Sequence, residues 1–80
     1  MSYAADIIPT KSSEEILKQF GTRLRAARKL KGLTQVELGR RVCTSGHMVS
    51  SWEHEKRLAD FSQLHKICAI LDVSIFYLIE

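Results

Sequence analysis

Residues 32–53 read GLTQVELGRRVCTSGHMVSSWE, and two helix starts lie eleven residues apart within this stretch. At the first start, Thr34 can cap the helix through its hydroxyl while Glu37 reaches back to the backbone of the cap. At the second start, Ser45 offers a cap after the apolar pattern lapses at Cys43. The stretch therefore predicts two short helices joined by a tight turn.

The second of these helices has two chemically different sides. Its apolar side carries Met48, Val49 and Trp52. Its opposite side is small and polar, and consists of Gly46, His47, Ser50, Ser51 and His54. Such a helix fits the major groove of DNA, about 12 Å wide, where base edges present distinct patterns of donors and acceptors. The pair therefore predicts a helix-turn-helix with double-stranded DNA as its partner, although the polar face alone is equally typical of a solvated helix.

The full chain has a net charge of +3, and its basic side chains are concentrated in residues 18–41. Residues 18–41 contain eight lysines and arginines but a single acid, Glu37. They are Lys18, Arg23, Arg25, Arg28, Lys29, Lys31, Arg40 and Arg41. This imbalance favours a phosphate partner, although a solvated helix surface has a similar composition.

The overall composition excludes several classes of protein. A chain of 80 residues with 45% hydrophobic and 26% charged residues predicts one globular domain. No apolar run approaches the roughly 20 residues that span a bilayer, and the N-terminus does not resemble a secretory signal. We therefore expect a cytoplasmic protein without a membrane partner. Cys43 and Cys68 form no recognisable disulfide framework, which agrees with a reducing compartment.

Apolar periodicity predicts three further helices around the central pair. The first is capped by Ser12 with Glu15 and ends at Gly32, and its Gly21 predicts a close approach of another helix. Its expected inward residues are Ile16, Leu17, Phe20, Leu24, Ala27 and Leu30. The fourth helix is capped by Asp60 with Gln63. Its expected inward residues are Leu64, Ile67, Cys68 and Leu71.

A last short helix, which begins at Ser74, completes a compact all-α bundle of five helices. We divide the chain into an N-terminal arm, residues 1–11, and a DNA-binding domain, residues 12–80. The last helix carries more apolar surface than it can bury inward, which predicts contact with a second copy of the chain. The expected dimer interface consists of Ile75, Phe76, Tyr77 and Ile79.

These motifs strongly resemble the lambda-repressor-like helix-turn-helix family, also called the Cro/repressor or XRE family. The resemblance extends from about Phe20 to Leu78. It includes Lys31-Gly32-Leu33-Thr34-Gln35-x-Glu37-Leu38 and Ser45-x-x-x-Val49-Ser50-x-Trp52-Glu53. It implies a five-helix domain that binds operator DNA as a homodimer and regulates transcription. Small members of the family include phage repressors, antitoxins and controller proteins of restriction-modification systems.

The resemblance also implies roles for individual residues. The base-reading positions correspond to Gly46, His47 and Ser51, with Ser50 beside them. The expected phosphate contacts are Thr34, Gln35, Ser45, His54, Lys56 and Arg57, and Gln35 is also expected to brace the reading helix. Arg28 and Glu53 occupy positions that form an ion pair in related repressors.

The sequence departs from the family at three turn or loop positions. Cys43 stands where the family usually has glycine, and we predict that Cys43 adopts the left-handed conformation nevertheless. Glycine is also usual at Glu55 and proline at Ala59. We therefore expect the loop after the reading helix to differ from the family shape.

A metal or redox sensor is an alternative to DNA binding, and a protein-binding adaptor is compatible with it. A metal or redox sensor would use the pairs Cys43 with His47 and His65 with Cys68, whose spacings allow two ligands on one helical face. An adaptor would bind a protein partner such as a toxin or RNA polymerase. An enzyme is not expected, because no nucleophile, base and orienting group share a plausible pocket. We predict no cofactor and no metal site.

Overall fold

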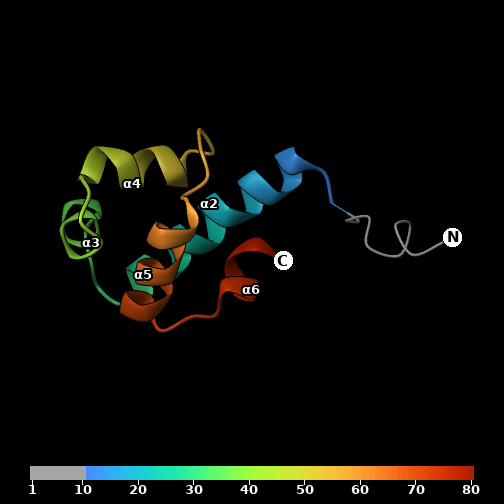
Figure 1. Ribbon diagram of the computed structural model, residues 1–80. Coiled ribbons are helices and arrows are strands. Elements are labelled where there is room, and N and C mark those ends of the chain that lie inside the picture. Colours follow the sequence, from blue (N-terminus) through green and yellow to red (C-terminus); the bar gives the residue numbers. More distant parts are fainter. Residues whose placement is uncertain (1–10) are drawn as a thin grey trace, which may run out of the picture.

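The computed structural model describes residues 11–80, which form five helices (Figure 1). The helices are α2 (Ser13–Leu30), α3 (Gln35–Arg41), α4 (Gly46–Glu53), α5 (Phe61–Leu71) and α6 (Ile75–Ile79). Residues 11–80 contain no strand, so the predicted all-α architecture is confirmed. The predicted arm lies outside the described residues, apart from Lys11. None of the five helices is both long enough and apolar enough to span a membrane.

Each helix begins at the cap that the sequence predicts. The side chain of every cap accepts a hydrogen bond from a backbone N–H three residues later; the caps are Ser12, Thr34, Ser45, Asp60 and Ser74. In α3, Thr34 Oγ1 accepts from Glu37 N at 3.0 Å, and Glu37 Oε1 accepts from Thr34 N at 2.8 Å. The bond from the Thr34 backbone, and then that from its hydroxyl, hold the pKa of Glu37 below its usual 4.5. Local side-chain chemistry therefore sets the helix starts.

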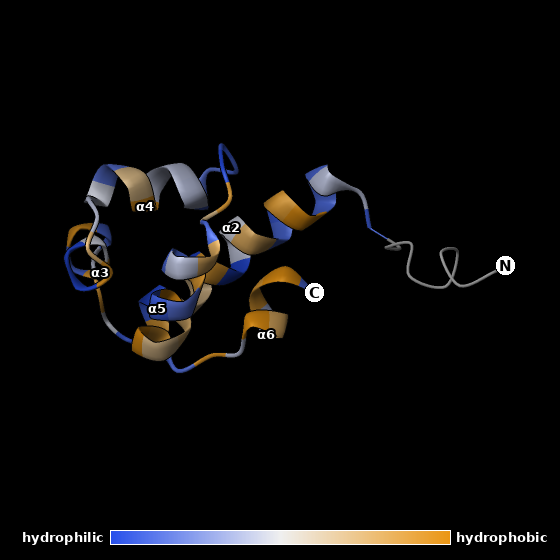
Figure 2. Cartoon of the chain, in the orientation of Figure 1, coloured by the Kyte–Doolittle hydropathy of each residue, from blue (hydrophilic) through white to orange (hydrophobic). Residues whose placement is uncertain are grey.

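The core lies where α2 packs against α4 and α6, with α5 in contact with α6. Its largest fully buried side chains are Trp52 and Phe20. The other buried apolar residues are Leu24, Ala27, Leu38, Val42, Val49, Ala59, Leu64, Ile67, Leu71 and Leu78. Figure 2 shows that α6 is almost wholly hydrophobic, in keeping with its place against this core.

The inward prediction for Leu30 is wrong. Leu30 is 88% exposed, whereas Arg28 in the same helix is buried. Leu30 follows Arg28 by two residues, so it lies about 200° further round the helix and points to solvent. Cys68 packs against the core, as predicted, although it is only half-buried. Desolvation raises the pKa of its thiol.

Left-handed backbone occurs at the turns. Gly32 has a φ of 71° directly after α2, and Cys43 has a φ of 63° between α3 and α4, as predicted. Glu55, in the loop after α4, also has a φ of 63°. Glu55 thus adopts the left-handed conformation that suits the glycine usual at this position in the family. The difference from the family shape that we expected for this loop is therefore absent at Glu55.

Candidate nucleic-acid interface

Close contacts between backbones fix the position of α4. A Cβ atom on Gly21 of α2 would lie 2.8 Å from the carbonyl oxygen of Trp52 and 2.9 Å from that of Glu53. The close approach predicted at Gly21 is therefore confirmed, and its partner is the end of α4. A Cβ atom on Gly39 of α3 would lie only 2.5 Å from the carbonyl carbon of Ser45. Both ends of α4 thus depend on glycine in the neighbouring helix, and sequence reasoning missed the second contact.

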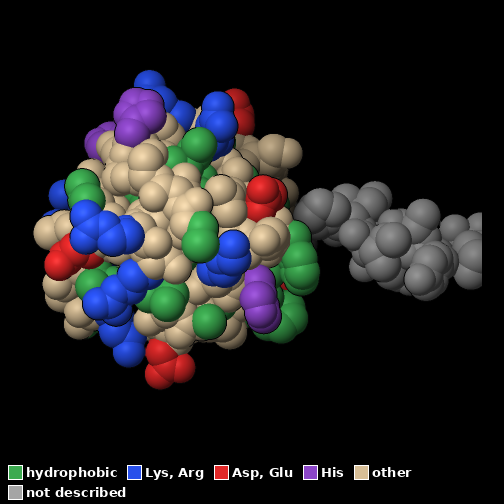
Figure 3. All heavy atoms as spheres, turned by 60° about the vertical axis from the view of Figure 1, so that its left-hand side comes forward, with side chains coloured by type: hydrophobic (Ala, Val, Ile, Leu, Met, Phe, Trp, Pro, Cys, Tyr) green, Lys and Arg blue, Asp and Glu red, His purple; other side chains and the backbone are tan. Residues whose placement is uncertain are grey.

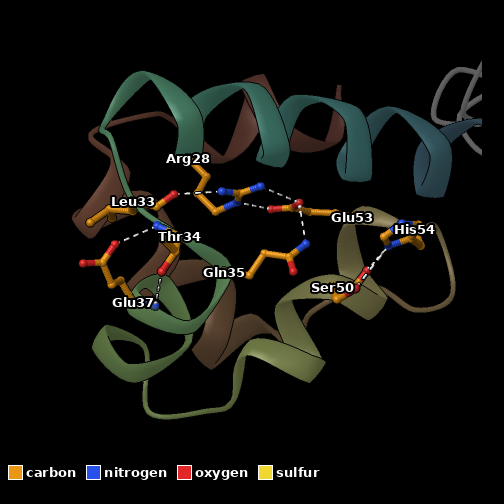
Figure 4. Close-up of polar contacts among 8 residues, drawn as sticks. All are labelled: Arg28, Leu33, Thr34, Gln35, Glu37, Ser50, Glu53 and His54. Atoms are coloured by element: carbon orange, nitrogen blue, oxygen red, sulfur yellow. Dashed lines mark hydrogen bonds and ion pairs between the residues drawn. The ribbon is translucent and has the colours of Figure 1, made fainter.

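The predicted ion pair between Arg28 and Glu53 is present and buried (Figure 4). Arg28 Nε donates to Glu53 Oε2 at 2.6 Å, and Arg28 Nη2 donates to Glu53 Oε1 at 3.0 Å. A third guanidinium nitrogen, Nη1, donates to the carbonyl oxygen of Leu33 at 2.8 Å. The side chains of Arg28 and Glu53 are 9% and 1% exposed. The hydrogen bond to Glu53 raises the pKa of Arg28, so the guanidinium stays charged.

Gln35 extends this cluster to α3. Its Nε2 atom donates to Glu53 Oε1 at 3.1 Å, so the end of α4 is bonded to both α2 and α3 (Figure 4). The bracing role expected of Gln35 therefore has a direct geometric basis. The second N–H of Gln35 Nε2 can donate a hydrogen bond to a phosphate oxygen.

The polar face of α4 lies on the surface, as expected. His47 is exposed, and Ser50 and Ser51 are half-buried. Gly46 has a packing role, because a Cβ atom there would lie 2.8 Å from Val36 Cγ2 in α3. Gly46 can offer only its backbone to a ligand.

The residues expected at phosphate lie around α3 and α4. Thr34 and Ser45 use their oxygens as helix caps, and the hydroxyl proton of Ser45 is left available to a phosphate. His54, Lys56 and Arg57 are exposed just after α4. Figure 3 shows lysine, arginine and histidine side chains around this side of the molecule.

Two arginines of the basic segment have other partners. Arg28 is buried with Glu53, as described above. Arg23 lies 5.5 Å from the centre of the Tyr77 ring and donates to the carbonyl oxygen of Tyr77 at 2.6 Å. The basic side chains left exposed are Lys18, Arg25, Lys29, Lys31, Arg40 and Arg41.

The residues expected at a dimer interface differ in their exposure. Phe76 is 64% exposed and Tyr77 is 38% exposed. Ile75 and Ile79 are half-buried against the core. Phe76 is therefore the main apolar side chain that α6 presents to solvent.

The pairs Cys43 with His47 and His65 with Cys68, which the sequence suggests as metal ligands, are not joined by a third ligand in the described residues. Within residues 11–80, no group of three His, Cys, Asp or Glu side chains is placed to hold a metal ion. Cys43 is an exposed free thiol, and Cys68 is a half-buried one.

Comparison with solved structures shows two regulators of similar fold. The P22 c2 repressor in complex with synthetic operator 9T is 31% identical, with 76% of this chain and 92% of that chain covered and a TM-score of 0.74. The restriction-modification controller protein C.AhdI from Aeromonas hydrophila is also 31% identical, with 78% of this chain and 94% of that chain covered and a TM-score of 0.71.

A third structure has the fold in another setting. The hydroxypropylphosphonic acid epoxidase of S. wedmorenis matches with a TM-score of 0.76 and 21% identity. The match covers 85% of this chain but 36% of the enzyme, so it shows a shared fold alone. Comparison with curated protein sequences finds no match.

The sequence profile of the helix-turn-helix family matches residues 24–78, which include the whole α3–α4 unit. The two regulators named above have the same fold over most of their length. This chain therefore belongs to the helix-turn-helix family, in its lambda-repressor-like branch, and is a DNA-binding transcription regulator.

Proposed function

We propose that the protein binds a near-palindromic operator as a homodimer, with α4 of each copy in the major groove. The observation that carries this proposal is the exposed polar face of α4 on a helix whose end is fixed by the buried Arg28–Glu53 pair. The P22 c2 repressor, a relative with 31% identity, has been solved in complex with operator DNA, which supports the same mode here.

Sequence preference is assigned to α4. His47 is exposed in the first turn and carries two ring nitrogens that can meet base edges. Ser50 and Ser51 lie one turn further on and supply hydroxyls. Gly46 contributes only its backbone and permits a close approach. This sparse set leaves part of the specificity to DNA shape.

Register on the DNA is assigned to phosphate contacts. These come from Thr34, Gln35, Ser45, His54, Lys56 and Arg57, which flank the reading face. Such contacts position the protein and make binding depend on salt, with each phosphate contact adding about one unit to the slope of log K against log salt.

Dimerisation is assigned to α6. Phe76 is the apolar side chain that the helix presents to solvent, with Tyr77 beside it. A two-fold arrangement would bury both copies of Phe76 and place the half-sites about 34 Å apart.

Selection of bound fragments from a random DNA pool tests the mode of binding. We expect a symmetric consensus with half-sites about one helical turn apart. His47→Ala should change the preference at one position in each half-site, whereas His65→Ala, an exposed histidine on α5, should not. A pool that shows no consensus at moderate salt would contradict operator recognition.

Sedimentation analysis tests the dimer. Phe76→Ser should shift the protein toward the monomer and weaken operator binding. Phe61→Ser is the matched control, because Phe61 is 76% exposed on α5. If Phe76→Ser leaves both properties unchanged, the surface of α6 becomes the candidate contact for a protein partner such as a toxin or RNA polymerase.

A further inference from the structure

Ser50 and His54 form a bonded pair on the polar face of α4. His54 is the C-cap of the helix and follows Ser50 by one turn. Its Nδ1 atom lies 2.8 Å from the backbone carbonyl oxygen of Ser50 and 3.2 Å from the Ser50 hydroxyl oxygen (Figure 4). The two side chains are therefore arranged before any ligand arrives.

This geometry determines which ring nitrogen carries the proton. A carbonyl oxygen only accepts hydrogen bonds, so Nδ1 at 2.8 Å must donate. The same N–H also faces Ser50 Oγ, which accepts it through one of its two lone pairs. The hydroxyl proton of Ser50 then points away from His54. Accepting one bond also polarises the hydroxyl, which makes it a better donor.

We propose that His54 is a positioning residue that makes Ser50 a hydrogen-bond donor to a base edge. This inference rests on the proposed placement of α4 in the major groove. Adenine N7, guanine N7 and O6, and thymine O4 accept hydrogen bonds there, whereas cytosine offers the N4 donor. The second lone pair of Ser50 Oγ is a weaker acceptor once Nδ1–H is bound, so the pair favours these bases over cytosine on the strand that Ser50 faces.

Ser51 provides the matched comparison on the same helix. It is half-buried like Ser50, but none of the side-chain hydrogen bonds found in residues 11–80 involves its hydroxyl. Its hydroxyl can turn to donate or to accept. Ser51→Ala removes a base-reading serine but leaves the pair intact, so its effect should fall at a different operator position from that of Ser50→Ala.

A double-mutant cycle on DNA affinity tests the proposal. The operator selected by the wild-type protein is compared with operators that carry cytosine at each position in turn, and the ratio of Kd values measures discrimination. At one position, Ser50→Ala and His54→Ala should each lower this ratio about fivefold, which corresponds to about 1 kcal/mol. The double variant should lose no more than either single variant. His54→Asn should retain the discrimination, because its amide N–H can replace Nδ1–H.

Three results would overturn the inference. His54→Ala could weaken binding to all operators equally, as expected of a phosphate contact alone. The two single variants could have additive effects, which would mean that the residues act independently. Ser50→Ala could leave every ratio unchanged. These results differ from failure of the proposed function, in which the wild-type protein selects no consensus at all.

Discussion

Removal of the Glu53 carboxylate should strongly destabilise the fold. In Glu53→Ala, two guanidinium donors of Arg28 and the amide donor of Gln35 lose their acceptor inside the protein. Breaking one side of a buried ion pair costs about 3–5 kcal/mol. A domain of this size has a free energy of unfolding of about 4–12 kcal/mol, so the variant should lose at least a quarter of its stability.

Denaturation in urea, followed by circular dichroism, measures this loss. Glu55→Ala is the control, because Glu55 is an exposed acid only two residues away. The double variant Arg28→Met/Glu53→Leu should recover most of the stability, since no charge is then left buried without a partner. A loss below about 1 kcal/mol for Glu53→Ala would refute the reasoning, because it would place the pair among exposed ion pairs.

Three further predictions concern local conformation and pH. Cys43→Gly should raise the free energy of unfolding by about 1 kcal/mol in urea denaturation, because the left-handed backbone then carries no Cβ penalty; an unchanged value would contradict strain at this turn. Gly39→Ala should lower the thermal midpoint sharply, because the new Cβ atom would clash with the backbone of Ser45 and reduce the free energy of unfolding by about 3 kcal/mol. A midpoint equal to that of the wild type would show that α4 can move aside. The stabilisation from Glu37 should be complete above pH 4.5 and lost as the pH falls through its lowered pKa, because the carboxylate accepts the Thr34 bond more strongly than the neutral acid does. Glu37→Gln should flatten this acid decline, and a parallel decline in both proteins would exclude the cap as its cause.

Local chemistry made much of the fold predictable. Each helix start depends on one cap and a residue three positions later, so Ser12, Thr34 and Asp60 could be identified without knowledge of the tertiary structure. The left-handed turn at Gly32 follows similarly from the absence of a Cβ atom.

Contacts between distant segments were harder to predict. Gly39 looks like an ordinary helix residue in the sequence, and its role appears only when Ser45 folds back against it. Leu30 continues the apolar spacing of α2, yet it points to solvent at the last turn. Arg28 and Glu53 were paired through the family resemblance, because neither spacing nor composition specifies a partner 25 residues away. The assignment of individual DNA contacts stays a prediction.

The bonds that join α2, α3 and α4 through Arg28, Glu53 and Gln35 also have a kinetic consequence. A reading helix that is already held in place loses little conformational entropy when it meets DNA. Its association rate should then be limited by diffusion and by attraction to the phosphates rather than by refolding of the helix. Differences in affinity between operators should consequently appear mainly in the lifetime of the complex.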